Sequence, residues 1–235
     1  MPELAIVAAL EREVRGVTKN LKRVIHRHGS RDFTFYECEE MVVICGGMGA
    51  EAARRATEAA ISLYGPAKVY SVGFAGALRV EIRIGDVIVP EVVIDARDGS
   101  RTSALDEGKG ILVTFMAVAS AQQKASLAQA YGADIVDMEA AAVARAARAH
   151  GIAFGAIKAV SDDLNFEFPE MDRFIDPSGQ FRAGKFAWFV ALRPWLWPGV
   201  ARLAGNAGKA ARALVDRIER LRSDLQESTG KVSTH

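Results

Sequence analysis

Three acidic residues that lie far apart in the sequence each follow an apolar, strand-like run. Glu13 follows LAIVAAL, Glu139 follows an Ile-Val pair, and Asp162 ends the run IAFGAIKAVSD. Carboxyl groups in partly apolar clefts suit general acid–base catalysis, because burial raises their pKa. Each acid also has a structural interpretation: Glu13 as a solvated side chain, Glu139 as the partner of a helix dipole, Asp162 as a helix cap. Together, three acids at strand ends predict one pocket.

Two glycine-rich turns accompany these acids. GGMG at residues 46–49 precedes a helical pattern, and GFAG at residues 73–76 closes a buried strand. Backbone N–H groups at a helix N-terminus can cradle a phosphate, but glycines also serve in tight turns that bind no ligand. GGMG is not GxGxxG, and no acidic residue ends a following strand to hold a ribose. A dinucleotide-binding fold is therefore not expected.

The elements that must position these residues alternate between strands and helices. Apolar runs predict strands at residues 4–10, 32–38, 41–47, 68–78, 86–96, 110–115 and 152–162, and helical spacing predicts helices at 50–65, 121–131 and directly after 139. The second and third strands are expected to form a hairpin. The alternation indicates an α/β domain with a largely parallel sheet that helices cover on both faces. Because such sheets bind ligands beyond the carboxyl ends of their strands, the acids and glycine turns should meet at one edge.

The alternation stops near residue 165, where prolines and a glycine follow. We therefore divide the chain into a domain core at 1–165 and a C-terminal loop with a basic, aromatic helical extension at 166–235. Within the extension, residues 186–222 combine apolar and aromatic side chains with regularly placed arginines. This pattern fits an amphipathic helix at a membrane surface, and equally a helix that packs on the domain or on a dimer partner with its arginines solvated.

The overall composition is that of a soluble globular protein. The 235 residues are half apolar and one quarter charged, with a net charge of +1, which predicts no nucleic-acid partner. No secretory signal and no run of about 18 apolar residues is visible, so a cytoplasmic location is expected. HExxH, GxSxG and metal-ligand spacings are missing, and neither a metal nor a cofactor is expected.

Five segments, in order, resemble the purine/uridine phosphorylase superfamily, and within it the methylthioadenosine/S-adenosylhomocysteine nucleosidases. They are IVAALEREV (6–14), GGMGAEAARRAT (46–57), VGFAGALRVEIRIGDVIVP (72–90), VDMEAAAVARAARAHGIAF (136–154) and KAVSD (158–162). The resemblance implies a three-layer α/β fold with a twisted mixed central sheet, a homodimer, and cleavage of the N-glycosidic bond of a small-molecule nucleoside.

The resemblance also implies roles for single residues. Glu13 matches the acid that activates the attacking water, and Asp162 the acid that protonates the departing purine, with Ser161 orienting it. Met138 matches a residue that lies against the ribose, and Glu139 the carboxylate that accepts hydrogen bonds from the ribose hydroxyls. These roles agree with the chemistry, because breaking the bond builds positive charge on the sugar and negative charge on the base.

The turns add three substrate-binding candidates, Met48, Gly73 and Phe74. The family usually has a small or hydroxyl residue at the position of Phe74, so the bulk of this ring must reshape the pocket. Phosphorylases of the superfamily place a phosphate-binding arginine where this chain has Ser71, which favours water as the nucleophile. Phosphate stays open as a co-substrate, because an anion site could also form from Arg54, Arg55 or Arg79.

The segment between residues 86 and 138 is shorter than in typical nucleosidases, which removes part of the expected base-binding wall. Phe115 and Met116 are our candidates for base contacts. The shortened wall and the PWLWP tail resemble the hopanoid-associated phosphorylase subgroup, which implies adenosylhopane, a lipid-linked adenine nucleoside, as substrate. The extension would then make peripheral contact with the inner membrane face. A different hypothesis is a non-catalytic nucleoside-binding or membrane-docking module, which would not need both Glu13 and Asp162.

Overall fold

The computed structural model describes residues 2–105, 108–166, 171–174, 176, 182, 185–186, 189 and 197–232. Within these residues, eleven strands form one mixed sheet: β1 (Leu4–Ala8), β2 (Lys22–His28), β3 (Arg31–Glu37), β4 (Met41–Cys45), β5 (Lys68–Ala77), β6 (Val87–Ile88), β7 (Val92–Asp95), β8 (Arg101–Ser103), β9 (Ile111–Thr114), β10 (Ile135–Asp137) and β11 (Ala153–Asp162). The helices are α1 (Glu11–Thr18), α2 (Ala50–Tyr64), α3 (Ala121–Tyr131), α4 (Ala140–Ala149) and α6 (Trp197–Val232), with a short 3-10 turn, η1 (Met171–Phe174).

The centre of the sheet is parallel and its surroundings are mixed. The order is β2-β3-β4-β1-β5-β10-β9-β7-β8, and β11 pairs with β5 and β6 outside this path. β1 runs parallel to β4 and β5, and β11 runs parallel to β5, so four carboxyl ends share one edge. β10 runs antiparallel to β5 and brings its own carboxyl end towards the middle of that strand.

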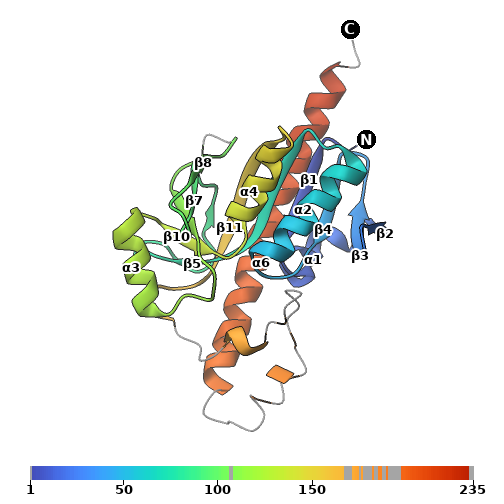
Figure 1. Ribbon diagram of the computed structural model, residues 1–235. Helices are drawn as coiled ribbons and strands as arrows, with labels where there is room; N and C mark the ends of the chain where they lie inside the picture. Colours follow the sequence, from blue (N-terminus) through green and yellow to red (C-terminus); the bar gives the residue numbers. More distant parts are fainter. Residues whose placement is uncertain are drawn as a thin grey trace.

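Helices cover both faces of the sheet, as Figure 1 shows, and this confirms the three-layer α/β prediction. α2 and α4 pack together on one face, and α1 packs with α6 on the other. Successive side chains of β1 point to opposite faces of the sheet, so they belong to two different core clusters. Ala5 and Val7 join the cluster under α2 and α4, while Leu4, Ile6 and Ala8 join the cluster under α1 and α6.

Most predicted elements form close to their predicted positions. The hairpin is present as β3 and β4, and the helix at 121–131 is α3. The run 86–96 is divided into β6 and β7 around Pro90, which has no N–H to donate to a sheet. β2 and β8 were missed, because both are mostly exposed and lack the buried apolar positions on which the prediction relied.

The C-terminal helical extension predicted from sequence is present as α6. This helix lies against α1 and β11, where Ala210, Leu214 and Ile218 are buried in the core. This part of the segment therefore packs on the domain, as one of the two interpretations of the sequence expected. Part of the predicted membrane-contacting stretch, including Trp188 and Trp195, lies outside the described residues. No helix in the part of the chain that the structure describes is long and apolar enough to span a bilayer.

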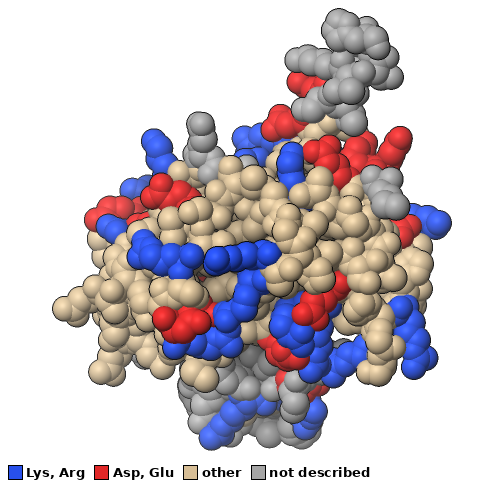
Figure 2. Space-filling model, turned by 45° about the horizontal axis from the view of Figure 1, so that its top comes forward, with Lys and Arg blue, Asp and Glu red and all other residues tan. Residues whose placement is uncertain are grey.

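Charged side chains are mixed in sign on the face shown in Figure 2. Lys and Arg lie in groups with Asp and Glu on a mostly uncharged surface. This distribution agrees with the net charge of +1 and is typical of a solvated surface.

Candidate active site

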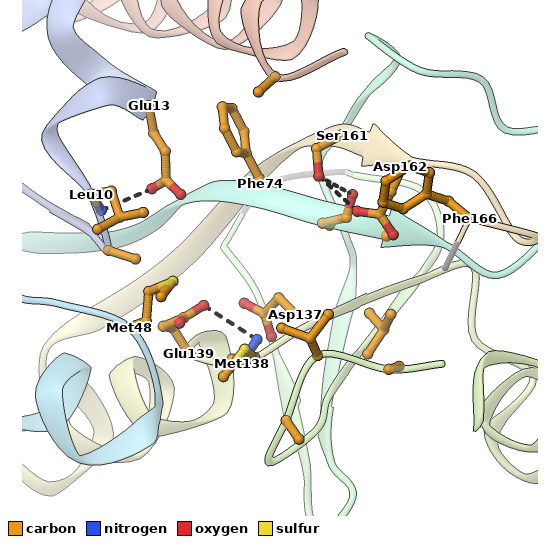
Figure 3. Close-up of a pocket in the computed structure, with 18 of the residues that line it drawn as sticks. Leu10, Glu13, Met48, Phe74, Asp137, Met138, Glu139, Ser161, Asp162 and Phe166 are labelled. Carbon is orange, nitrogen blue, oxygen red and sulfur yellow. Dashed lines mark hydrogen bonds between the residues drawn. The ribbon is translucent and has the colours of Figure 1, made fainter. Parts of the chain in front are cut away.

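One cavity of about 670 Å³ lies at the edge of the sheet where the parallel strands end, and all three predicted acids line it. In Figure 3, Glu13 and Asp162 approach this space from opposite sides, and Glu139 lies below them. The structure therefore brings together carboxylates from α1, from the start of α4 and from the end of β11.

Glu13 lies in the first turn of α1 and is only 5% exposed. Its Oε2 accepts a hydrogen bond of 3.2 Å from the backbone N–H of Leu10, which caps the helix. Burial raises the pKa of Glu13, although the bond from Leu10 and the charge of Lys158 oppose the rise. A carboxyl group with a raised pKa is suited to accept a proton from water near neutral pH.

Gly73 gives the Glu13 carboxyl its space. A Cβ atom at residue 73 would lie 3.0 Å from Oε2 of Glu13, closer than side chains normally approach. The residue does not itself line the cavity, so its contribution is the absence of a side chain.

Glu139 lies at the junction of β10 and α4, partly buried. The backbone N–H of Gly49 donates to its Oε1 at 2.7 Å, and that of Met138 donates to its Oε2 at 3.2 Å. Burial raises the pKa of Glu139 to about 7, and the charge of Asp137 adds to the rise, whereas Lys158 and the Gly49 bond oppose it. Met48 and Met138 line the cavity beside this carboxylate and present thioether surface (Figure 3).

Asp137 and Lys158 form a buried ion pair beneath the cavity that the sequence analysis missed as a functional feature. Nζ of Lys158 lies 2.8 Å from Oδ2 of Asp137 and donates to Oγ of Ser71 at 3.0 Å. Asp137 also accepts from the hydroxyl of Thr114 at 2.6 Å and from the N–H of Ala140 at 2.9 Å, which fixes the start of α4. Burial alone would lower the pKa of Lys158, but the nearby carboxylates outweigh it and raise the pKa. The sequence did contain a signal for this pair, because Lys158 interrupts an otherwise apolar strand.

Asp162 is held on both of its oxygens. The hydroxyl of Ser161 donates to Oδ1 at 2.8 Å (Figure 3), and Nζ of Lys124 donates to Oδ2 at 2.5 Å. Lys124 comes from α3, lines the cavity and is 1% exposed. The sequence analysis did not identify this lysine, because it lies in a polar stretch of helix with nothing to mark it.

The remaining wall of the cavity is mostly apolar. Phe74 lies between Glu13 and the Ser161–Asp162 pair in Figure 3, and Phe166 lies beyond Asp162. Leu203 and Ala207 add a surface from α6, so the C-terminal helix contributes to the cavity. Residues 117–120, which follow β9, line another part of the cavity wall.

Two expectations are wrong in detail. Phe115 and Met116, the candidate base contacts, do not line the cavity; Phe115 packs into the cluster under α3, and Met116 is 76% exposed. The arginines proposed as an anion site are also outside it. Arg54 and Arg55 pair with Glu51 on their own helix, and Arg79 pairs with Asp134. Each of these guanidinium groups forms an ion pair with a nearby acid; for Arg54 and Arg55 the acid lies three or four residues away on the same helix.

The polar side chains that line the cavity are four carboxylates, the cations of Arg12 and Lys124, and the hydroxyl groups of Ser120 and Ser161. Within the described ranges, no cluster of three or more His, Cys, Asp or Glu side chains could hold a metal ion. The arrangement can do acid–base chemistry on a ligand that presents hydroxyl groups between Glu13 and Glu139 and a ring nitrogen near Asp162.

A family model described as the phosphorylase superfamily matches residues 3–118 and 111–176, which together make up most of the chain. Two curated proteins, both 5'-methylthioadenosine/S-adenosylhomocysteine nucleosidases, are also similar. That of Buchnera aphidicola subsp. Acyrthosiphon pisum (strain Tuc7) is 29% identical over 96 residues, 38% of this chain and 40% of the relative. That of Hydrogenovibrio crunogenus is 30% identical over 98 residues, 39% of this chain and 40% of the relative. The chain thus matches 40% of the length of these relatives.

Solved structures with the same fold cover nearly the whole chain. The 5'-methylthioadenosine nucleosidase of Arabidopsis thaliana aligns with a TM-score of 0.73 and 18% identity over 96% of this chain and 97% of its own. The futalosine hydrolase of Helicobacter pylori strain 26695 aligns with a TM-score of 0.67 and 17% identity over 93% of this chain and 98% of its own. At these identities the likeness establishes the fold.

Proposed function

The chain belongs to the phosphorylase superfamily, and from this premise we propose that it cleaves the N-glycosidic bond of a purine nucleoside and releases adenine. The observation that carries the proposal is the meeting of Glu13, Glu139 and Asp162 in one cavity. The similarity to methylthioadenosine/S-adenosylhomocysteine nucleosidases supports the same reaction class.

In the proposed reaction each of the three acids has a separate role. Glu13 takes a proton from a water molecule, and the oxygen of that water forms a bond to C1′ of the sugar. The C1′–N bond breaks, its electron pair goes to the base, and a base nitrogen receives a proton at Asp162. Glu139 accepts hydrogen bonds from the ribose hydroxyls and orients the sugar. The side of the cavity that holds Glu13 and Glu139 stabilises the cationic sugar, and the side that holds Asp162 neutralises the leaving base.

Water is the preferred nucleophile in this proposal. The arginines that could have supplied an anion site, Arg54, Arg55 and Arg79, pair with acids and do not line the cavity. Ser71, at the position of the phosphorylase arginine, is buried against Lys158 instead. Phosphorolysis is the alternative, and it is separated from hydrolysis by the dependence of the rate on added phosphate.

We further propose a large apolar group on the 5′ carbon, with adenosylhopane as the specific substrate. The support is the apolar wall that Phe74, Leu203 and Ala207 build, with a surface from α6 that is continuous with the C-terminal extension. A cytoplasmic homodimer with peripheral membrane contact through residues 186–222 would deliver such a substrate. The apolar 5′ group is supported by the cavity lining, the membrane contact by the pattern of the extension, and adenosylhopane and the homodimer by the resemblances found in the sequence.

The test is adenine release by the purified protein from adenosylhopane, methylthioadenosine and S-adenosylhomocysteine, each with and without inorganic phosphate. We expect release without phosphate and a higher kcat/KM for adenosylhopane. No release from any of the three nucleosides would reject the proposed reaction. A clear preference for methylthioadenosine would reject the lipid-linked substrate, and an absolute requirement for phosphate would reject water as the nucleophile.

A further inference from the structure

Lys124 is a buried cation at the end of the cavity assigned to the leaving base. Its ammonium donates to Oδ2 of Asp162 at 2.5 Å and to the backbone carbonyl of Asp163 at 2.6 Å. The side chain is almost fully enclosed yet lines the cavity, so the Lys124–Asp162 pair faces the space that the substrate would occupy.

The surrounding chain leaves room for this pair. A Cβ atom on Gly76 would lie 2.6 Å from Oδ2 of Asp162 and 3.1 Å from Cε of Lys124, so any side chain there would displace one of them. Gly76 belongs to GFAG (73–76), which lies inside β5 and not in the turn expected from the sequence. The second glycine of this segment gives space to the Lys124–Asp162 pair in the same way that Gly73 gives space to Glu13.

Two side-chain donors contact the carboxyl group of Asp162. The Ser161 hydroxyl donates to one oxygen of Asp162 and the Lys124 ammonium to the other, so the carboxyl group accepts on both sides. The Lys124 ammonium thus lies in direct contact with Oδ2 of Asp162. The ammonium is the group that holds a dissociable proton, and it lies in contact with the carboxylate.

We propose that Lys124 is a positioning residue that aligns Asp162 and supplies, through it, the proton that the departing base receives. This inference rests on the proposed glycosidic cleavage. As the C1′–N bond breaks, the electron pair goes to the base, one proton moves from Nζ of Lys124 to the carboxyl group of Asp162, and Asp162 passes a proton to the base nitrogen. The pair is left as a neutral amine and a carboxylate, and it regains a proton from solvent after the base leaves.

Other charged groups near the pair come from α6, α1, β10, β11 and the start of α4. Arg202 on α6 contacts the Asp163 side chain at 2.5 Å, and Phe166 lies under the same guanidinium. Across the cavity lie Glu13 and Glu139, with Asp137 paired to Lys158. Replacement of Lys124 alone leaves all of these side chains in place.

The test compares K124M and K124R with the wild type on an adenine nucleoside that the wild type cleaves. An amine ordinarily keeps its proton to a far higher pH than a carboxyl group does, about 10.4 against 3.9. In K124M the proton must reside on Asp162 itself, so we expect the ratio of its kcat to that of the wild type to fall about tenfold or more from pH 6 to pH 8. A constant ratio would assign Lys124 a structural role only and overturn the proposal.

K124R separates proton supply from charge. Arginine keeps the cation beside Asp162 but does not release its proton in proteins. We expect K124R to fold and to bind substrate with a KM near that of the wild type, while kcat falls by about 10²-fold. Wild-type kcat in K124R would overturn the proposal, because charge alone would then suffice. Failure of the wild type to release adenine would instead reject the proposed function.

Discussion

The backbone N–H of Gly49 donates a hydrogen bond of 2.7 Å to Oε1 of Glu139. Gly49 is the residue before α2, and Glu139 is the residue before α4, so this bond joins the starts of the two packed helices. The GGMG turn therefore does bind an anion at a helix N-terminus, but that anion is a side chain of the protein itself. The bond also directs the carboxyl group into the cavity.

Replacement of Glu139 separates these two functions. A glutamine keeps a carbonyl oxygen that can accept from Gly49, so E139Q should unfold close to the wild-type temperature. It loses the negative charge that grips the ribose hydroxyls, and we expect kcat/KM to fall by about 10²-fold. E139A also leaves the Gly49 N–H without its acceptor and should lose about 1–3 kcal/mol of unfolding free energy. Steady-state kinetics and denaturant unfolding measure the two effects; equal stability of E139Q and E139A would contradict the bond's structural role.

The raised pKa of Glu139 predicts how stability changes with pH. Its pKa is about 7 in the folded protein against an ordinary value of 4.5, so between these values the folded state binds more protons than the unfolded state. The contribution of Glu139 to the free energy of unfolding is fully present below pH 4.5. It is lost as the pH rises through 7, and the free energy of unfolding then falls by up to about 3 kcal/mol. Glu13 acts in the same direction. Denaturant unfolding at pH 5 and pH 8 should show a larger loss in wild type than in E139Q. An identical loss in both would contradict the shift.

Glu13→Gln tests the base that activates water. The amide oxygen can still accept from the N–H of Leu10, so the start of α1 is preserved. Without a group that accepts the proton of water, we expect kcat to fall by about 10²–10⁴-fold while KM changes little. The measurement is steady-state adenine release, with the thermal unfolding midpoint as the control for folding. Unchanged kcat would remove Glu13 from the mechanism.

Alanine at either glycine of GFAG should reduce activity, and G76A should do so without unfolding the protein. In G76A the new Cβ would meet Oδ2 of Asp162 at 2.6 Å, and in G73A it would meet Oε2 of Glu13 at 3.0 Å. Both neighbours are the ends of side chains and can shift, but Gly73 also has a φ of 158°, which L residues rarely adopt, so G73A strains the backbone of β5 as well. We expect kcat to fall about tenfold or more in G76A and less in G73A.

Gly205 on α6 supplies the matched control, because no atom lies within 4 Å of a Cβ placed there. G205A should leave kcat unchanged and stabilise the helix by about 0.5–1 kcal/mol. A loss of activity in G205A similar to that in G76A would show that the effect is not local to Asp162.

Leu203 tests the contribution of α6 to substrate choice. Leu203 lines the cavity, whereas its neighbour Ala204 is exposed and does not. An aspartate at 203 places a charge in the apolar wall and should lower the preference for a large apolar 5′ group over methylthioadenosine by about tenfold or more. A204D on the same helix should leave this preference unchanged. Equal ratios of kcat/KM in L203D and wild type would exclude α6 from substrate recognition.

The order of strands and helices and the three acids could be predicted from the sequence because their signals are local. Apolar periodicity marks each buried element, and Glu13, Glu139 and Asp162 stand directly at the ends of such runs. Exposed β2 has no such period and was missed. Phe115 was misassigned because the sequence does not tell which way a side chain turns after its strand ends.

The sequence by itself determined which chemistry is available, since the residue types at the strand ends fix the acids and the small residues fix the turns. Only the tertiary structure decided which groups share a proton or a charge. Lys124 and Asp162 are 38 residues apart, and Lys158 and Asp137 come from different strands, so no local pattern links them. The energy of an ion pair depends on distance and burial, and both are set when α3 packs near the end of β11 and β10 pairs within the sheet.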